Sequence, residues 1–172
     1  MGRRARGAEL GAKREPGGFS AWPRACARSE NFYRLSYTAR SLLFEFLTQY
    51  SGANNGDLTC AWTVLRVRGW NSKSTIQFAR DELLRTGWIV VTRYGGLGVT
   101  ELYALTFFDI DECQGKVDPE LVGRRLSYWR TGRNLHYLPK KKAAAKMKSH
   151  PDSQGGKSRN SGRQIPILRQ AS

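Results

Sequence analysis

The segment that follows Ser72 carries the side chains best suited to bind another molecule. A lysine can donate hydrogen bonds to guanine, a glutamine can pair with adenine, and a threonine or an aromatic ring can contact the thymine methyl group. These residue types occur together as Lys73, Ser74, Thr75, Gln77 and Phe78. We therefore expect the segment to contact base edges of DNA. The alternatives are an ordinary solvated helix face for the polar residues and packing against the domain for Phe78.

A second set of side chains could bind the sugar-phosphate backbone, which positions a protein on DNA without selecting a sequence. The expected phosphate contacts are Arg66, Arg68, Arg80, Arg93 and Tyr94. Solvated surface charge is the alternative for the arginines. Arg85 could pair with Asp81, four residues earlier on the same helix, as well as with DNA.

Two helices are expected before this segment. Ser36 is a good N-cap for a helix over 37–50, which carries apolar residues at helical spacing. The helix ends in a turn over 51–56 that is rich in Gly, Asn and Ser. Thr59 is expected to cap a short second helix, which Gly69 ends.

The third helix should present the candidate DNA contacts. Ser72 can cap it and Gly87 can end it. Its apolar residues, spaced three and four apart and expected in the core, are Ile76, Ala79, Leu83 and Leu84. The polar candidates then lie outward or at the flanks of this apolar face.

Two strands are expected after Gly87. Residues 88–93 and 101–107 are rich in β-branched and aromatic residues, and the loop between them contains three glycines. This pattern predicts a β-hairpin, while 57–58 could form a short extended segment. The element order predicts an α+β winged helix-turn-helix: three helices, of which the second and third form the helix-turn-helix, and a hairpin that forms the wing.

Four stretches of the chain resemble small winged-helix proteins encoded by prophages, plasmids and other bacterial mobile elements. They are NNGDL (54–58), RGWNSK (68–73), ELLRTGWI (82–89) and TRYGG (92–96). The resemblance covers about residues 35–113 and implies both the winged-helix fold and DNA binding.

The third helix is also similar to the recognition helix of many bacterial winged-helix repressors. The chain departs from these repressors in two places, one in this helix and one in the hairpin. Arg80 stands where that pattern has an apolar residue. Its stem could cover the edge of the core, or its guanidinium could face phosphate. The hairpin tip has no Arg or Lys, so contacts of the wing with DNA are not implied.

The net charge of +15 is concentrated near the two ends of the chain. Residues 1–34 contain eight Lys/Arg and three Asp/Glu, and residues 139–172 contain nine and one. Such segments are poor in branched apolar residues and tend to stay disordered. We expect a disordered basic arm over 1–29, the winged-helix domain over 30–112, and a disordered basic tail over 139–172.

Between the domain and the tail, residues 113–138 are expected to be a linker with a short helix. The helix would start near Asp118-Pro119 and present a short apolar stripe formed by Val122, Leu126 and Trp129. The stripe could pack on the domain, form a homodimer or bind a partner.

An enzyme is not expected. The sequence has no phosphate-binding loop, no paired carboxylates with a supporting histidine and no nucleophile motif. Cys26, Cys60 and Cys113 are widely spaced, so no metal site is predicted, and no cofactor or small-molecule substrate is inferred. No apolar run approaches the roughly 18 residues that span a bilayer, so no membrane contact and a cytoplasmic, nucleoid-associated location are expected.

Together these features predict a sequence-specific protein that binds double-stranded DNA, with the third helix in the major groove. A transcriptional regulator of a phage or mobile element is the first interpretation. The alternatives are a phage or plasmid replication initiation or accessory factor, and a winged-helix adaptor that binds protein.

Overall fold

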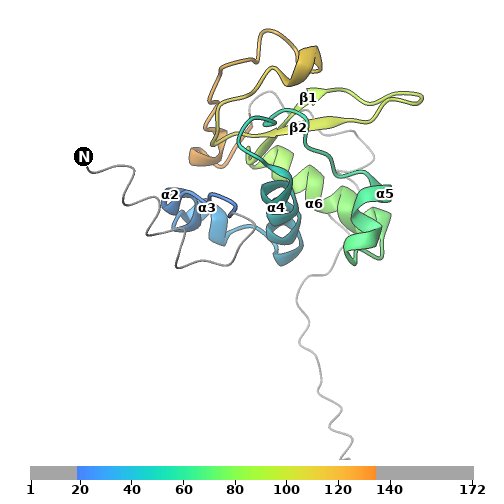
Figure 1. Cartoon of the computed structure of the whole chain (residues 1–172). Helices are drawn as coiled ribbons and strands as arrows, with labels where there is room; N and C mark the ends of the chain where they lie inside the picture. Colours follow the sequence, from blue (N-terminus) through green and yellow to red (C-terminus); the bar gives the residue numbers. More distant parts are fainter. Residues whose placement is uncertain (1–18, 135–172) are drawn as a thin grey trace, which may run out of the picture.

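A computed structural model gives the fold of the protein and describes residues 19–134. These residues form an α+β structure with a two-stranded antiparallel sheet (Figure 1). The elements are α2 (Arg24–Ala27), α3 (Glu30–Tyr33), α4 (Tyr37–Gln49), α5 (Trp62–Leu65), η1 (Arg66–Arg68), α6 (Lys73–Arg85), β1 (Ile89–Arg93), β2 (Leu102–Leu105), η2 (Cys113–Gly115) and η3 (Tyr128–Arg130).

The two 13-residue helices, α4 and α6, begin at the predicted caps. The Ser36 and Ser72 hydroxyls accept hydrogen bonds from the third residue of each helix. Glu82 of α6 accepts two further hydrogen bonds from the backbone N–H and hydroxyl of Ser36, which joins the two helices. No helix within residues 19–134 combines the length and apolar composition needed to cross a membrane.

The predicted hairpin is confirmed, with Ile89 opposite Leu105 and Val91 opposite Tyr103. An irregularity between Val91 and Arg93 turns Thr92 inward, where its hydroxyl donates to the Gly56 carbonyl at 2.6 Å. The expected extended segment is also present, because Leu58 pairs with Tyr103.

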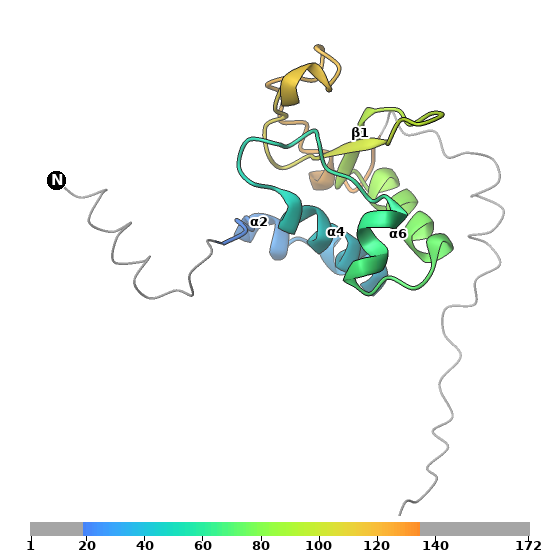
Figure 2. The ribbon, with the colours of Figure 1, turned by 45° about the vertical axis from the view of Figure 1, so that its right-hand side comes forward.

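The hairpin is covered on both faces. Helices α4 and α6 lie below it in Figure 1, and the segment after β2 lies above it, an arrangement also seen in Figure 2. All four residues of β2 are buried. On the upper face, Val90 and Ala104 pack with Ile110 and Val117. A hairpin with only one face on a core would have left this side to solvent.

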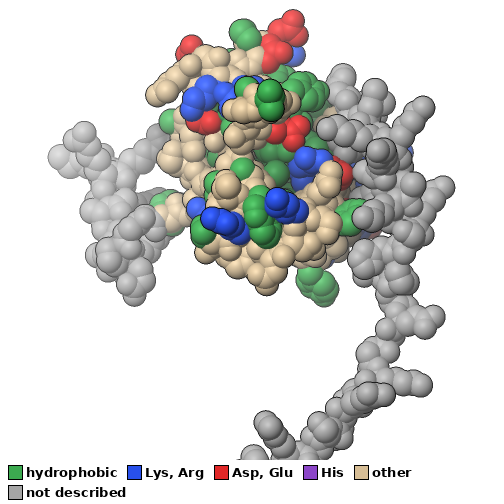
Figure 3. Space-filling view, turned by 90° about the vertical axis from the view of Figure 1, so that its right-hand side faces the viewer, with side chains coloured by type: hydrophobic (Ala, Val, Ile, Leu, Met, Phe, Trp, Pro, Cys, Tyr) green, Lys and Arg blue, Asp and Glu red, His purple; other side chains and the backbone are tan. Residues whose placement is uncertain are grey.

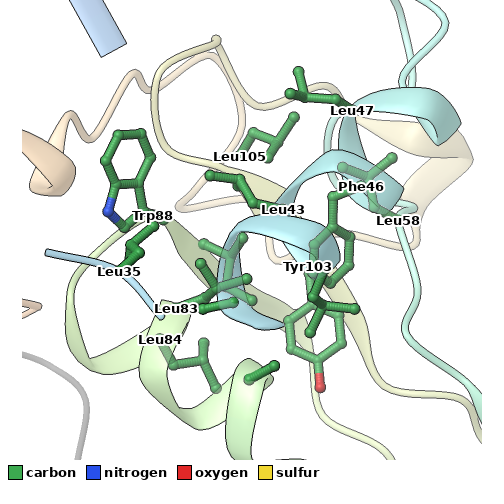
Figure 4. Packing of buried hydrophobic residues seen from close by; sticks show 14 of the residues in the cluster. Leu35, Leu43, Phe46, Leu47, Leu58, Leu83, Leu84, Trp88, Tyr103 and Leu105 are labelled. Carbon is green, nitrogen blue, oxygen red and sulfur yellow. The ribbon is translucent and has the colours of Figure 1, made fainter. Parts of the chain in front are cut away.

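The main core lies between α4, α6 and the hairpin (Figure 4). It includes the residues expected from the third helix, and Phe46 of α4 packs on Tyr103 with ring centroids 5.5 Å apart. Trp88 is fully buried and lies between two other indoles, stacked on Trp22 at 6.4 Å and on Trp129 at 5.5 Å.

The domain boundaries of 30 and 112 are therefore too narrow. At the N-terminal side, α2 forms inside the segment predicted to be a disordered arm, and Cys26 is fully buried. At the C-terminal side, Val117 and Trp129 belong to the core. Residues 1–18 of the predicted arm and the predicted tail over 139–172 lie outside the described residues.

The predicted helix after Pro119 is wrong. Residues 119–123 form turns, residues 124–127 have no regular structure, and η3 follows; Gly123 and Ser127 have a left-handed backbone, at φ +74° and +52°. The predicted apolar stripe does not form, because Trp129 is buried while Val122 is exposed. Helical spacing alone did not identify this irregular segment, whose Trp129 ring packs on Trp88.

Asn55 joins the turn after α4 to the end of the hairpin. Its side chain is fully buried, accepts a hydrogen bond from Leu105 N–H at 2.7 Å, and donates to the carbonyls of Leu105 and Asp109 at 3.0 and 2.9 Å. The backbone of Asn55 also exchanges two 2.8 Å hydrogen bonds with Asp111. The sequence indicated a turn here but not its partners.

We predict that Asn55→Ala lowers the free energy of unfolding by about 2–4 kcal/mol, because it leaves buried backbone groups of β2 without partners. Urea denaturation followed by circular dichroism measures this loss. Asn54→Ala is the matched control, since the Asn54 side chain bonds to Ser51 and Gln49 near the surface, and should cost under about 1 kcal/mol. Equal losses in the two variants would contradict the assigned role of Asn55.

Candidate nucleic-acid interface

A short helical segment and a tight turn lead into α6. α5 continues directly into η1, and Gly69 then adopts a left-handed backbone with φ +95°. Trp70 N–H donates to the Leu65 carbonyl at 3.2 Å, which closes the turn. The helical segment ends at Gly69, as predicted. The predicted cap is wrong, because α5 starts after Ala61 and the Thr59 hydroxyl accepts from Ala61 N–H before the helix begins.

The outer face of α6 exposes the polar residues expected to contact bases. Lys73, Ser74, Thr75 and Gln77 are exposed, whereas Ile76 and Ala79 face the core. Phe78 is half-buried, so its ring is less accessible than these polar side chains. The Ser74 hydroxyl lies 2.8 Å from that of Ser72.

Lys73 and Trp62 link the start of α6 to α5. The Lys73 ammonium lies 5.7 Å from the centroid of the Trp62 ring, within the range of a cation–π contact. At an exposed site this contact is worth only about 0.5–1 kcal/mol. Lys73 is thus held over α5 but can be released by a stronger acceptor. The sequence analysis did not single out Trp62, which is 11 residues away from Lys73.

Arg68 holds the turn against α4. Its guanidinium donates to the carboxylate of Glu45 at 2.9 Å and to the hydroxyl of Thr48 at 3.1 Å, and the Trp70 indole N–H also donates to Glu45. The Arg68 side chain is still 38% exposed. A phosphate contact from this residue would have to share the guanidinium with Glu45.

Arg80 does not fit the expected phosphate contact. Its side chain is only 18% exposed and forms ion pairs with Asp81 at 2.7 Å and with Glu101 at 3.2 Å. Glu101 also accepts a hydrogen bond from the Tyr103 hydroxyl. At the position where an apolar residue is usual, Arg80 therefore joins α6 to the base of the hairpin through Glu101. Because Asp81 pairs with Arg80, the expected alternative pair with Arg85 is absent among the described residues.

Tyr103 and Arg80 in this cluster each keep a single charge state at neutral pH. Burial raises the pKa of the Tyr103 phenol far above its ordinary value, so the hydroxyl stays neutral and donates to Glu101. Burial by itself lowers the pKa of Arg80, but the hydrogen bond to Asp81 and the charges of Asp81 and Glu101 raise it overall. Arg80 remains charged and paired at all physiological pH values.

The other three expected phosphate contacts differ in their surroundings. The Arg66 side chain is exposed and makes no ion pair or hydrogen bond with another residue in 19–134, although its backbone bonds to Trp62 and Gly69. Arg93 is half-buried and donates to the Thr100 carbonyl at 3.1 Å, across the base of the hairpin loop (residues 94–100). Tyr94 is 81% exposed. Arg66 and Tyr94 are therefore free to contact a ligand, whereas Arg93 supports the loop.

The hairpin loop and the start of α6 lie on the same side of the molecule in Figures 1 and 2. Figure 3 faces this side and shows Lys and Arg in separate spots, with hydrophobic and acidic side chains between them. Two exposed apolar residues there were missed by sequence reasoning: Val67 of η1 and Leu97 in the loop. A count of charged residues could not have located them.

Other chemistry has little support within residues 19–134. The three cysteines are unpaired, and no three His, Cys, Asp or Glu side chains in these residues come together as a metal site. Burial raises the pKa of the Cys26 thiol to about 11, although Arg130 lowers it, so this thiol stays protonated at neutral pH.

Comparison with known proteins identifies no relative. No family model matches the chain, and neither a curated protein nor a solved structure is significantly similar to it.

Proposed function

We propose that the protein binds double-stranded DNA in the cytoplasm through a winged helix-turn-helix, with α6 in the major groove, and acts as a transcriptional regulator. The observation that carries the proposal is the exposed row on α6, from Lys73 to Gln77, directly after the turn at Gly69. Helix-turn-helix proteins place the first residues of their second helix against base edges.

The geometry supports different roles for the residues of this interface. Lys73 and Gln77 have the donors and acceptors that distinguish base pairs. Arg66 and Tyr94 lie exposed on the flanking elements, where they could contact phosphates on either side of the groove. Arg68 and Arg80 are better described as residues that fix the turn and the hairpin relative to α4 and α6.

Replacing Lys73 and Gln77 with alanine tests the proposal. The substituted protein should remain folded, because both side chains are exposed and alanine favours a helix, so stability should change by no more than about 0.5 kcal/mol. Affinity for a duplex selected from a random pool should fall by about 1–3 kcal/mol for each residue that contacts a base. Affinity for unrelated duplexes should fall much less. Titrations followed by fluorescence anisotropy measure both losses.

Arg124→Ala is the matched charge control. Arg124 is exposed in the segment that covers the far face of the hairpin, and its removal should leave the ratio of specific to unrelated binding unchanged. Equal weakening on all duplexes by the double substitution would show that α6 does not select sequence. Unchanged binding by a folded double variant would exclude this face as the DNA site.

A protein-binding adaptor is the second candidate. It is favoured by two exposed apolar side chains, Val67 of η1 and Leu97 of the hairpin loop, at 77% and 106% exposure. Exposed apolar side chains of this kind can contact a protein partner. The same titrations separate the candidates, because an adaptor would show no preference among duplexes. Mapping of bound sites to promoters or to replication origins then separates a regulator from a replication factor.

A further inference from the structure

A polar pocket lies at the end of α6 remote from the candidate DNA contacts. In Figure 1, α6 runs from the side of α5 towards the side where α3 and residues 128–134 lie. The pocket has a volume of about 600 Å³, within the range of small-molecule sites. It is lined by Asn31, Arg34, Glu82, Arg85, Thr86, Thr131, Gly132 and Arg133.

Three arginines from separate parts of the chain line this pocket. Arg34 follows α3 and pairs only with Glu30, in an ion pair whose two side chains are 70% and 77% exposed. Arg85 and Arg133 form no ion pair with a residue in 19–134. Such an exposed pair as Arg34–Glu30 is weak and readily exchanged. The guanidinium groups are therefore available to an anion.

The single carboxylate in the wall does not neutralise them. Both oxygens of Glu82 accept hydrogen bonds from Ser36, at 2.8 and 2.7 Å, and this holds the carboxylate at the start of α4. The lining thus has an excess of positive charge. In a hollow partly shielded from water, such an excess favours binding of an anion.

The carbonyl groups at the end of α6 are hydrogen-bonded, so they do not repel an anion as free carbonyl oxygens would. Thr86, Trp88 and Gly87 N–H groups bond the carbonyls of residues 82, 83 and 84. The Arg85 carbonyl accepts from Asn134 N–H at 3.0 Å. With its final carbonyls paired, the helix presents the Arg85 guanidinium, rather than bare acceptors, at this pocket.

We propose that this pocket binds the phosphate group of a small phosphorylated ligand, such as a nucleotide or a sugar phosphate. Guanidinium groups bind phosphate oxygens through paired hydrogen bonds, and three of them can surround one phosphate or diphosphate. The Thr86 and Thr131 hydroxyls donate to backbone carbonyls, so their oxygens are left as acceptors. They suit the hydroxyl groups of a ligand that carries more than phosphate.

Calorimetric titration of the full-length protein at about 150 mM salt tests this site, a salt level that screens contacts of exposed charges. The probes are pyrophosphate, AMP and adenosine. We expect saturable binding of pyrophosphate and AMP and none of adenosine. Arg85→Ala and Arg133→Ala should each weaken AMP binding about tenfold or more, because each removes a charged donor. Arg124→Ala removes the same charge elsewhere and should change binding less than about twofold.

Thermal unfolding is measured for every variant. If Arg85→Ala proves unstable, Arg85→Gln keeps most of the stem without the charge and should show the same loss of AMP binding. The proposal is overturned if Arg124→Ala weakens binding as much as the pocket variants, or if adenosine binds as well as AMP. Binding seen with duplex DNA but with neither small phosphate overturns it as well.

Discussion

A fragment of residues 30–112 is expected to lack a cooperative unfolding transition at 25 °C, whereas a fragment of residues 19–134 unfolds cooperatively. The shorter fragment loses Trp22, Cys26, Val117 and Trp129 from the core. Each large apolar side chain contributes about 1.5–3 kcal/mol when buried, so the combined loss exceeds about 5 kcal/mol. This is comparable to the whole stability of a small domain, about 5–15 kcal/mol.

Urea titration of both fragments, followed by tryptophan fluorescence and circular dichroism, measures the difference. Limited proteolysis of the full chain offers an independent check, since the resistant core should extend to near residues 19 and 134. Equal unfolding midpoints for the two fragments would show that the aromatic contacts at the ends add nothing to the domain.

Trp88→Ala should lower the free energy of unfolding by about 3–5 kcal/mol, the usual cost of removing a large buried aromatic side chain. Trp88 is fully buried between the indoles of Trp22 and Trp129, and the rings of Phe32 and Phe107 lie 5.9 and 6.2 Å away. The substitution leaves a cavity that these rings cannot all close. Chemical denaturation measures the change.

Trp88→Phe is the control for this substitution. The indole N–H of Trp88 has no hydrogen-bond partner within residues 19–134, so phenylalanine removes a buried unpaired donor while keeping an aromatic ring. We expect it to cost clearly less than the alanine variant, about 1–2 kcal/mol. Losses below about 1 kcal/mol for both variants would contradict the packing of Trp88 between the two indoles.

The parts of the fold that the sequence predicted are those set by local chemistry. Ser36 and Ser72 cap helices because a hydroxyl next to an apolar periodic segment satisfies the first free N–H groups. Gly69 and Gly87 end segments because both adopt positive φ. At Gly87 a side chain would also collide with Tyr128, 2.7 Å from the position of a Cβ atom, a contact that no local pattern contains.

The parts that were missed depend on contacts distant in sequence. α2 and α3 have four residues each, too few to show a period, and the aromatic rings of Trp22 and Phe32 anchor this region on Trp88. Residues 113–138 were expected to be a linker with a short helix, because Val122, Leu126 and Trp129 have helical spacing. The burial of this segment follows from the second face of the hairpin, where Val90 and Ala104 need a cover.

The candidate site was also predicted only in part, because some of its features follow from local patterns and others from contacts distant in sequence. Exposure of Lys73 and Gln77 follows from the helical period once Ile76 and Ala79 face the core. The partners of the arginines do not follow from any period. Arg68 meets Glu45 from another helix, and Arg80 meets Glu101 from the hairpin, so two residues expected at phosphates are tied within the domain.

The stacking of Trp22 and of Trp129 on Trp88 also bears on how the chain acquires its structure during synthesis. The two contacts join residues that are 66 and 41 positions apart in sequence, and contacts of such separation form late because a long loop must close first. A nascent chain that ends before residue 129 lacks the indole of Trp129 that stacks on Trp88. Such a chain exposes an aromatic surface of the kind that chaperones bind and that promotes aggregation. The fold is therefore complete only after residue 129 has been synthesised.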